Sequence, residues 1–204
     1  MSQPIADLAA LEALYGQPGA ASVAKEVTRL TSGYRALIEA SPFFVLATSG
    51  PGGLDASPRG DAPGFLRVAD ERTLLIPDRR GNNRLDSLRN ILHDPRVGLL
   101  FLIPGVNETL RVNGRAVIDV DPALCDSFAV DGKPPKSVLV VTVESVFFQC
   151  ARAVLRARLW DPTAQVTRAS LPSTGALLAE ASAGQEGGEA YERSLNERIP
   201  KTLY

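Results

Sequence analysis

The turn at residues 78–84 is the part of the sequence best suited to bind an anion. It follows a short apolar run, Leu74–Pro77, and precedes Arg84–His93, whose apolar residues recur at helical spacing. The first N–H groups of a helix have no partner within the helix, and guanidinium groups bind oxyanions through paired hydrogen bonds. The turn is therefore a candidate phosphate site, made of Arg79, Arg80, Asn82, Asn83 and Arg84.

A solvated basic turn explains the same residues without a ligand. In that interpretation Asn82 or Asn83 caps the helix, and the arginines face water. Positive charges at a helix N-terminus oppose the helix dipole, which favours an anion nearby. The residues alone leave both interpretations open.

A second candidate segment is Ser-Pro-Arg-Gly-Asp, residues 57–61. Proline cannot donate a hydrogen bond to a neighbouring strand, so Pro58 predicts a sheet edge or a bulge. Gly60 has no side chain and would let a flat group approach the backbone, with Arg59 and Asp61 on either side. A surface hairpin explains this segment equally well.

The chain has one His and two Cys, which excludes several classes of site. Four Cys or His ligands for a structural zinc ion cannot be assembled within one chain. His93 ends a predicted helix, where a histidine complements the helix dipole, so we do not expect a Ser-His-Asp triad. Cys125 and Cys150 are widely spaced, which predicts free thiols in a reducing compartment.

Composition narrows the class of protein further. The 204 residues are 45% hydrophobic, and 22 Lys or Arg nearly balance 23 Asp or Glu, for a net charge of -1. Such a chain can fold around its own core, and it lacks the net basicity of a duplex-binding protein. No basic start precedes an apolar stretch, and the longest apolar run, Val97–Val106, is too short to span a membrane. We expect a cytoplasmic protein that binds neither nucleic acid nor a membrane.

Hydrophobic periodicity predicts helices at both ends of the chain. One covers Ile5–Tyr15, and a longer one covers Val23–Ile38, with Ser22 as its N-cap and Ser41-Pro42 as its stop. Further helices are predicted at Pro122–Phe128, Ser173–Ala183 and Glu189–Arg198.

The middle of the chain is predicted to be mainly β, because short apolar runs alternate with turn residues. Too few helices separate these runs for a doubly wound fold, so we expect a closed or sandwiched sheet. We expect one domain, with a helical segment at 1–41, a β domain at 42–162 and a helical extension at 163–204 packed on it. The predicted strands are Phe43–Ser49, Leu54–Pro58, Phe65–Val68, Thr73–Pro77, Val97–Ile103, Leu110–Val120 and Val138–Ala151.

Taken in order, several segments resemble the pyridoxamine phosphate oxidase-like FMN-binding split-barrel family. The similarity covers residues 40–162 and is closest to a bacterial subfamily of probable FMN-dependent enzymes of unknown substrate. The segments are residues 57–61, 74–84, Leu-Arg-Asn-Ile at 88–91, 94–101, Glu-Thr-Leu-Arg-Val-Asn-Gly-Arg-Ala at 108–116, Gly-Lys-Pro-Pro-Lys at 132–136, 148–153 and 156–162.

This resemblance implies a six-stranded Greek-key split β-barrel with N- and C-terminal helices. It also implies a homodimer with FMN at the subunit interface. By the same resemblance, Ser57, Pro58, Arg59, Gly60 and Asp61 lie along the flavin. The turn Arg79–Arg84 holds the phosphate, and Pro77 before it also belongs to the cofactor site. Thr109 reaches the ribityl chain or the ring edge with the assistance of Arg111. Arg152, Arg158 and Trp160 belong to the C-terminal part that the partner subunit supplies.

The implied activity is that of an FMN-dependent oxidoreductase acting on a small organic substrate. The flavin itself carries the electron transfer, so no catalytic side chain is predicted. The oxidase uses a C-terminal His on its substrate, and this chain has no His after residue 93, which argues against pyridoxamine phosphate as the substrate. A deazaflavin-dependent reductase and a non-catalytic flavin- or haem-binding module are the alternatives.

Overall fold

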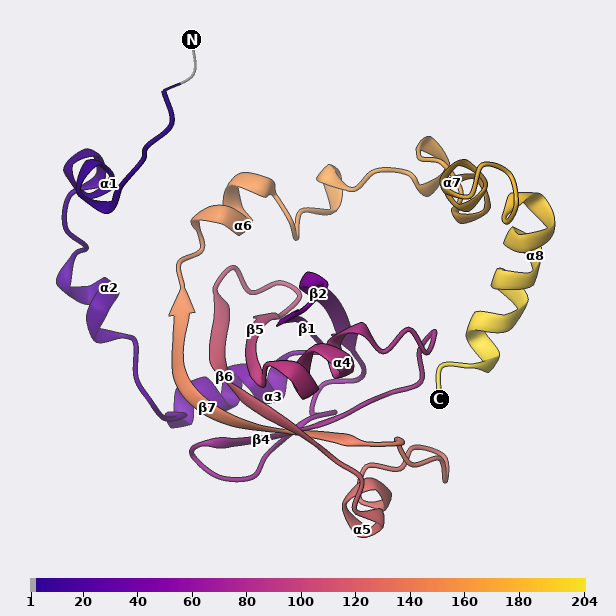
Figure 1. Cartoon of the computed structure of the whole chain (residues 1–204), viewed down its shortest axis with the longest axis horizontal. Coiled ribbons are helices and arrows are strands. Elements are labelled where there is room, and N and C mark those ends of the chain that lie inside the picture. The colour runs from indigo at the N-terminus through magenta and orange to yellow at the C-terminus, as the bar shows by residue number, and fades with distance from the viewer. Residues whose placement is uncertain (1–2) are drawn as a thin grey trace.

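A single antiparallel sheet forms the centre of the molecule, and helices flank it (Figure 1). The computed structural model describes residues 3–204. Seven strands are hydrogen-bonded in the order β2-β1-β5-β6-β7-β4-β3. They are β1 Phe43–Gly50, β2 Gly53–Gly60, β3 Arg67–Val68, β4 Thr73–Pro77, β5 Arg96–Leu102, β6 Thr109–Asp119 and β7 Val138–Gln149.

All seven predicted strands are present, and the chain is mainly β with flanking helices, as predicted. β4 matches its predicted range, and β3 is shorter than predicted. Gly50 pairs with Gly53 across the hairpin turn between β1 and β2, and Gly53 has a φ of 109°, which glycine adopts without strain. The resemblance implied six strands, and the seventh is the two-residue β3.

The inner face of the sheet carries the hydrophobic core. Alternate residues of β1, β5 and β6 are buried, as expected when one face of a sheet packs on a core. The ring of Phe44 stacks on Phe65 at 6.0 Å and meets Phe101 at 5.0 Å between ring centroids. Ile38 closes the core from the N-terminal side and is completely buried.

The long helix predicted for Val23–Ile38 is wrong, because Val27 pairs with strand β7. The N–H and C=O groups of Val27 bond to Val146 at 3.0 and 2.8 Å. This bridge divides the segment into α2, Ala20–Ala24, and α3, Ser32–Ala40. Thr31 caps α3 by accepting the N–H of Tyr34, so Ser22 is not the cap. α3 ends before Ser41-Pro42, as predicted.

Helix α4, Asp86–His93, lies against β1 because Gly50 leaves room for it. A Cβ atom at Gly50 would stand 2.1 Å from Oδ1 of Asn90, which no structure tolerates. Asn90 in turn donates to Oγ1 of Thr48 at 3.1 Å. The end of β1 at Gly50 and the Thr48–Asn90 hydrogen bond therefore fix how closely α4 lies against β1. His93 is the last residue of α4, as predicted.

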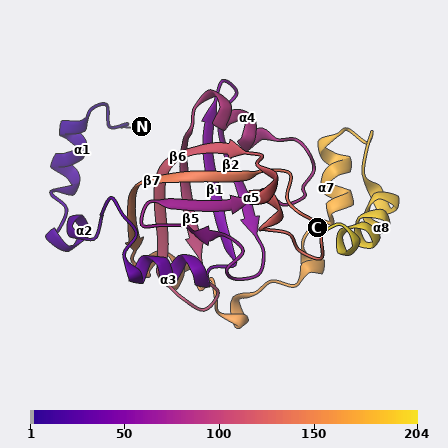
Figure 2. The same ribbon diagram turned by 90° about the horizontal axis from the view of Figure 1, so that it is seen from below.

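The helices near the two ends of the chain lie on opposite sides of the sheet (Figure 2). α1, Leu8–Tyr15, and α2 lie on one side, and α7, Thr174–Ala181, and α8, Gly188–Arg198, lie on the other. α5, Pro122–Asp126, and α6, Arg152–Ala157, flank β7 in sequence. Both cysteines are free, Cys125 buried and Cys150 exposed. Within residues 3–204, no helix is long and apolar enough to cross a membrane.

Candidate functional site

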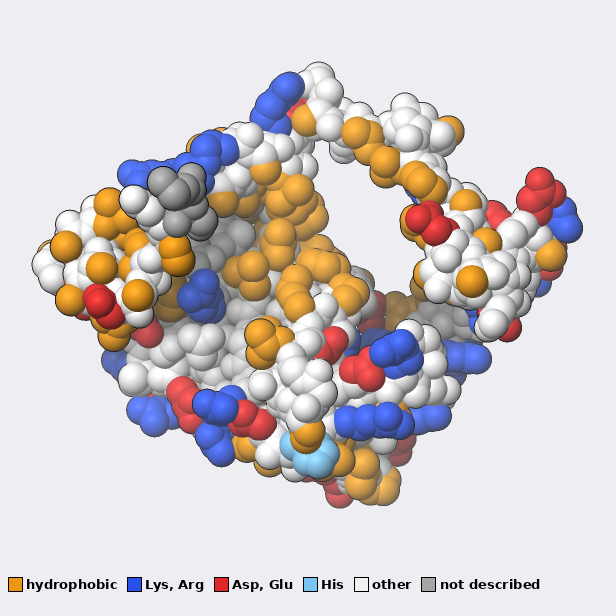
Figure 3. Space-filling view, turned by 45° about the horizontal axis from the view of Figure 1, so that its top comes forward, with side chains coloured by type: hydrophobic (Ala, Val, Ile, Leu, Met, Phe, Trp, Pro, Cys, Tyr) orange, Lys and Arg blue, Asp and Glu red, His pale blue; other side chains and the backbone are white. Residues whose placement is uncertain are grey.

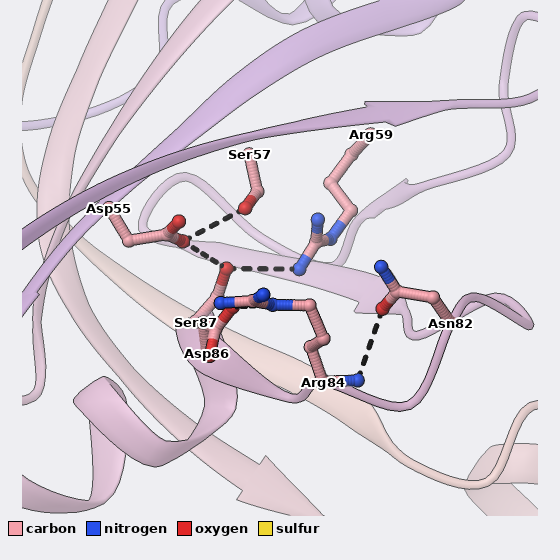
Figure 4. Close-up of polar contacts among 7 residues, drawn as sticks. All are labelled: Asp55, Ser57, Arg59, Asn82, Arg84, Asp86 and Ser87. Carbon is pink, nitrogen blue, oxygen red and sulfur yellow. Dashed lines mark hydrogen bonds and ion pairs between the residues drawn. The ribbon is translucent and has the colours of Figure 1, made fainter. Parts of the chain in front are cut away.

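Polar side chains from β2 and α4 form a network at the start of α4 (Figure 4). The hydroxyls of Ser57 and Ser87 donate to Oδ2 of Asp55 at 2.9 and 2.7 Å. Nη2 of Arg59 donates to the hydroxyl of Ser87 at 3.2 Å, and Ser87 is only 2% exposed. In Figure 4 the side chains of Arg59 and Arg84 extend toward the space beside Ser87. We call these residues, together with Asn82 and Asp86, the α4 cluster.

The prediction that Asn82 or Asn83 caps α4 is wrong. The residue before the helix is Leu85, which is left-handed with a φ of 63°, and no side chain caps the first turn. Asn82 uses its side-chain oxygen inside the preceding turn, where it accepts the N–H of Arg84 at 3.0 Å. Asn83 also has a positive φ, 60°, so the chain enters α4 through an irregular turn. The first N–H groups of α4 are therefore left without a side-chain acceptor.

Two carboxylates balance the two guanidinium groups of the α4 cluster. Asp86 accepts from Nε of Arg84 at 2.8 Å, and this pair is exposed, with 73% and 42% of the side chains accessible. Asp55 accepts a hydrogen bond from the hydroxyl of Ser87, and the same hydroxyl accepts one from Arg59. Asp55 and Asp86 thus partly neutralise the positive charge of the arginines near the start of α4.

Arg79 belongs to a different cluster, whose residues are partly buried. Its Nε donates to Oδ2 of Asp61 at 2.8 Å, and Nη1 donates to the carbonyl of Phe128 at 2.8 Å. Only 17% of the Arg79 side chain and 7% of the Asp61 side chain are accessible. The hydroxyl of Tyr204 donates to Oδ1 of Asp61 at 2.5 Å, and the Arg79 guanidinium lies 5.6 Å from the centre of the Tyr204 ring. We call Asp61, Arg79 and Tyr204 the tyrosine cluster.

The contacts of the tyrosine cluster move two pKa values in opposite directions. Burial alone would raise the pKa of Asp61, but hydrogen bonds from Tyr204, from the N–H of Ala62 and from Arg79 outweigh it and hold the pKa below its usual value. The pKa of the Tyr204 hydroxyl is raised, first by its hydrogen bond to Asp61 and then by burial. Both shifts favour an ionised Asp61 beside a neutral phenol.

Asp78 directly follows β4, is the first residue of the arginine-rich turn, and is half-buried. Burial raises the pKa of its carboxyl group, and the positive charges of Arg59 and Lys136 oppose that rise. Pro77 before it is buried, whereas Arg80 and Asn83 after it are exposed. The five residues predicted to bind phosphate therefore do not lie in one cluster, because Arg79 belongs to the tyrosine cluster and Arg84 to the α4 cluster.

The remaining predicted residues lie on the other face of the sheet or beyond it. Pro58 aligns with Val45, Leu100 and Arg111 across four strands, so Pro58 and Arg111 share the face opposite to Ser57 and Arg59. Thr109 donates to Oε1 of Gln149 at 3.2 Å, and Arg111 lies 5.2 Å over the ring of Phe147. Near α6, Arg152 is exposed, Arg158 pairs with Asp161 at 2.7 Å, and Trp160 donates to the carbonyl of Val106 at 2.8 Å.

Gly60 lies close to residues of its own chain at the start of β1. A Cβ atom there would lie 3.3 Å from both the ring of Phe43 and the carbonyl of Pro42. The groups that approach this glycine closely therefore include the chain's own β1. Pro58 does lie on an edge strand, as predicted, because β2 ends the sheet.

A family model described as pyridoxamine 5'-phosphate oxidase matches residues 30–150, which include all seven strands and α4. The chain belongs to this family. The resemblance to the FMN-binding split-barrel proteins is thereby confirmed. No curated protein matches the chain.

Solved structures with similar folds are distant in sequence from this family member. HupZ from Group A Streptococcus is 19% identical, with a TM-score of 0.48, and the match covers 58% of this chain and 93% of HupZ. An FMN-binding protein from Syntrophomonas wolfei is 13% identical, with a TM-score of 0.43, and the match covers 57% of this chain and 83% of that protein.

Sequence reasoning missed four residues of the two clusters in this pyridoxamine 5'-phosphate oxidase family member, namely Asp55, Asp86, Ser87 and Tyr204. Asp55 precedes the predicted segment by two residues, and the alternation of a strand would have placed its side chain beside Ser57 and Arg59. Ser87 follows Arg84 by three residues, about one helical turn, which could also have suggested it. Nothing in the sequence links Tyr204 to Asp61, which lies 143 residues earlier.

Proposed function

We propose that this protein is an FMN-binding flavoprotein that holds the FMN phosphate at the α4 cluster. The observation that carries the proposal is the convergence of Arg59, Arg84 and two serine hydroxyls on the uncapped start of α4. Membership of the pyridoxamine 5'-phosphate oxidase family supports it. The Syntrophomonas wolfei neighbour, which is named as an FMN-binding protein, is consistent with it.

The chemistry of the α4 cluster fits a phosphate group. Guanidinium groups, hydroxyls and free N–H groups at a helix start are all donors, which is what a phosphate dianion requires. Ser57 and Ser87 now donate to Asp55, so they are already oriented toward a negatively charged acceptor. A phosphate would compete with Asp55 for these two hydroxyls.

FMN would supply electron transfer when bound, and the chain would supply position and charge. In this proposal Arg59 and Arg84 fix the phosphate, and Asn82 keeps the turn before α4 in shape. Segment 58–61 runs along the edge of the sheet, from which the flavin would extend. We assign no catalytic side chain, and the proposed activity is that of an FMN-dependent oxidoreductase on a small organic substrate.

A homodimer with flavin at its interface completes the proposal, together with closure of the sheet into the split barrel of the family. Pro58, Thr109 and Arg111 lie on the outer face of the sheet, where Leu54 is 89% exposed. Figure 3 shows hydrophobic side chains along the opening between the sheet and the C-terminal segment. Leu155, Leu159 and Val166 in that segment are 57%, 46% and 70% exposed. A second copy would cover these surfaces and bring Arg152, Arg158 and Trp160 toward the flavin of its partner.

The test begins with the ligand of the protein as purified. Mass spectrometry of the released ligand and the absorbance spectrum separate FMN from a deazaflavin or haem. Replacing Arg84 by Ala should then weaken FMN by about 1.5–3 kcal/mol, the value of a hydrogen bond to a charged group. Riboflavin lacks the phosphate and should bind both proteins equally.

The matched control for this test is Arg89→Ala, which removes the same charge from an exposed position of α4. This variant should bind FMN like the parent. Equal FMN affinity in the parent, Arg59→Ala and Arg84→Ala proteins would exclude the phosphate site. A sedimentation mass of one 21.7 kDa chain, with the flavin still bound, would exclude the dimer. Absence of turnover with reduced nicotinamide and with other common donors would argue for a carrier rather than an enzyme.

A further inference from the structure

Tyr204 lines a cavity to which no residue of the α4 cluster contributes. The cavity has a volume of about 600 Å³, in the range of small-molecule sites, and its walls come from α3, the segment after β2, and the loop after α5. Phe65 and Phe128 are among its apolar residues, and Arg67 stacks over the ring of Phe128 at 4.4 Å. Tyr204 reaches the cavity from a segment that follows α8.

In the cavity, the phenol side chain of Tyr204 contacts a carboxylate and a guanidinium group. The carboxylate of Asp61 accepts a hydrogen bond from the Tyr204 hydroxyl, with 2.5 Å between the two oxygens, and the guanidinium of Arg79 lies beside the face of the ring. Asp61 is held in place from its other oxygen by Arg79, and Arg79 is held by the carbonyl of Phe128. A carboxylate that is rigid, nearly buried and ionised at neutral pH is a selective acceptor for a hydroxyl group.

Apart from Tyr204, the segment after α8 makes few contacts with the rest of the protein. α7 and α8 pack on each other, and the segment after α8 is exposed at Ile199 and Leu203, which are 48% and 59% accessible. Tyr204 therefore reaches Asp61 as a side chain on a tether, not as part of the sheet. A tethered group of this kind can be displaced by a free molecule that carries the same chemical group.

We propose that Asp61 and Arg79 form a binding site for a phenolic ring, and that Tyr204 occupies this site within its own chain. A ligand with a hydroxylated aromatic ring displaces Tyr204, places its hydroxyl on Asp61 and its ring beside Arg79, and extends into the cavity toward Phe65 and Phe128. Neither Asp61 nor Arg79 belongs to the α4 cluster, so the inference does not rest on the proposed phosphate site.

The probe for the test is 4-methylphenol, which is the tyrosine side chain as a free molecule, and the control is toluene, which lacks the hydroxyl group. Binding is measured by titration calorimetry on the parent and on Tyr204→Ala, with each protein as purified. Because the tether gives Tyr204 a high effective concentration, its removal should tighten 4-methylphenol about tenfold or more. In Tyr204→Ala, toluene should bind about tenfold more weakly than 4-methylphenol, because it leaves Asp61 without its donor.

Further variants keep the outcome decisive. Tyr204→Phe retains the ring and loses the hydroxyl, so 4-methylphenol should bind it with an affinity between those of the parent and Tyr204→Ala. Tyr191→Ala, in α8, removes a tyrosine outside the cavity and should bind like the parent. Circular dichroism checks that each variant folds, and Tyr204→Phe carries the test if Tyr204→Ala does not.

Equal affinity of 4-methylphenol for the parent, Tyr204→Ala and Tyr204→Phe would overturn the proposal. Equal affinity of toluene and 4-methylphenol for Tyr204→Ala would do the same. Flavin absorbance is recorded at each addition, because a phenol that stacks on a bound flavin changes the spectrum and binds all variants alike. The outcome is therefore independent of whether FMN binds at the α4 cluster.

Discussion

The α4 cluster and the tyrosine cluster use the same residue types in opposite ways. Arg79 and Arg84 stand five positions apart in one turn, yet Arg79 is 17% accessible and Arg84 is 73% accessible. Arg79 bonds to a carboxylate and a carbonyl of the protein, whereas Arg84 pairs with an exposed neighbour, Asp86. The first arrangement fixes the structure, and the second leaves donors available to a ligand. A run of arginines in a sequence therefore need not be one binding site.

The largest expected effect comes from breaking the buried pair. Arg79→Ala should lower the free energy of unfolding by about 3 kcal/mol, because it leaves the nearly buried Asp61 carboxylate without its counter-charge. Arg84→Ala should change it by less than about 0.5 kcal/mol, as expected for an exposed pair. Urea denaturation measures both. Similar losses in the two variants would remove the distinction between the clusters.

Within the α4 cluster, Ser87 is the member that should matter for stability. Ser87→Ala removes a donor to Asp55 and an acceptor for Arg59 in a buried position, which should cost about 1 kcal/mol. Ser57→Ala is the matched control, since Ser57 is more exposed and its hydroxyl bonds only to Asp55. The control should lose less than half as much. The reverse order would show that β2, not α4, holds the network together.

Asp55 provides a test of the competition between carboxylate and phosphate. Asp55→Asn removes a negative charge next to the proposed phosphate position and should tighten FMN by on the order of 1 kcal/mol, about fivefold. Asp94→Asn makes the same change at the other end of α4 and should have no effect. Fluorescence titration of apoprotein with FMN measures both affinities. Weaker FMN binding in Asp55→Asn would instead make this carboxylate a positioning residue for the two serines.

The smallest expected effect is on the pH dependence of stability. The folded-state pKa of Asp61 lies below its usual value of 3.8, so its contribution to stability is complete above about pH 4. That contribution is lost as the pH falls through the folded-state pKa. Asp61→Asn should therefore be less stable than the parent at neutral pH and should lose less stability below pH 4. Thermal unfolding at several pH values checks this, and parallel profiles would contradict it.

The strands could be predicted from the sequence because their burial follows a local alternation. β4 was predicted at its observed bounds, and β1, β5 and β6 within one or two residues. The break between α2 and α3 could not be predicted, since Val27 finds its partner, Val146, in a strand far along the chain. Helical spacing around Val27 carries no information about that pairing.

The two segments that form the candidate site were predicted from the sequence, but the contacts between their side chains were not. Segments 57–61 and 79–84 do meet, through Arg59 and Arg84 near Ser87 and through Asp61 and Arg79. The alternation of a strand separates Ser57 and Arg59 from Pro58, and applying it would have divided the segment between two faces. The cap at Asn82 failed for another reason, because two left-handed residues before α4 redirect the chain.

The two ends of the sheet protect the protein against aggregation. A long, regular edge strand can recruit another chain through its unpaired N–H and C=O groups. Here one edge is β3, which has two residues, and the other is β2, which carries Pro58 two residues before its last residue. Proline interrupts the row of donors, and Arg59 beside it adds a charge that opposes stacking of identical edges. The proline that suggested a binding segment thus also keeps the sheet from growing into a fibre.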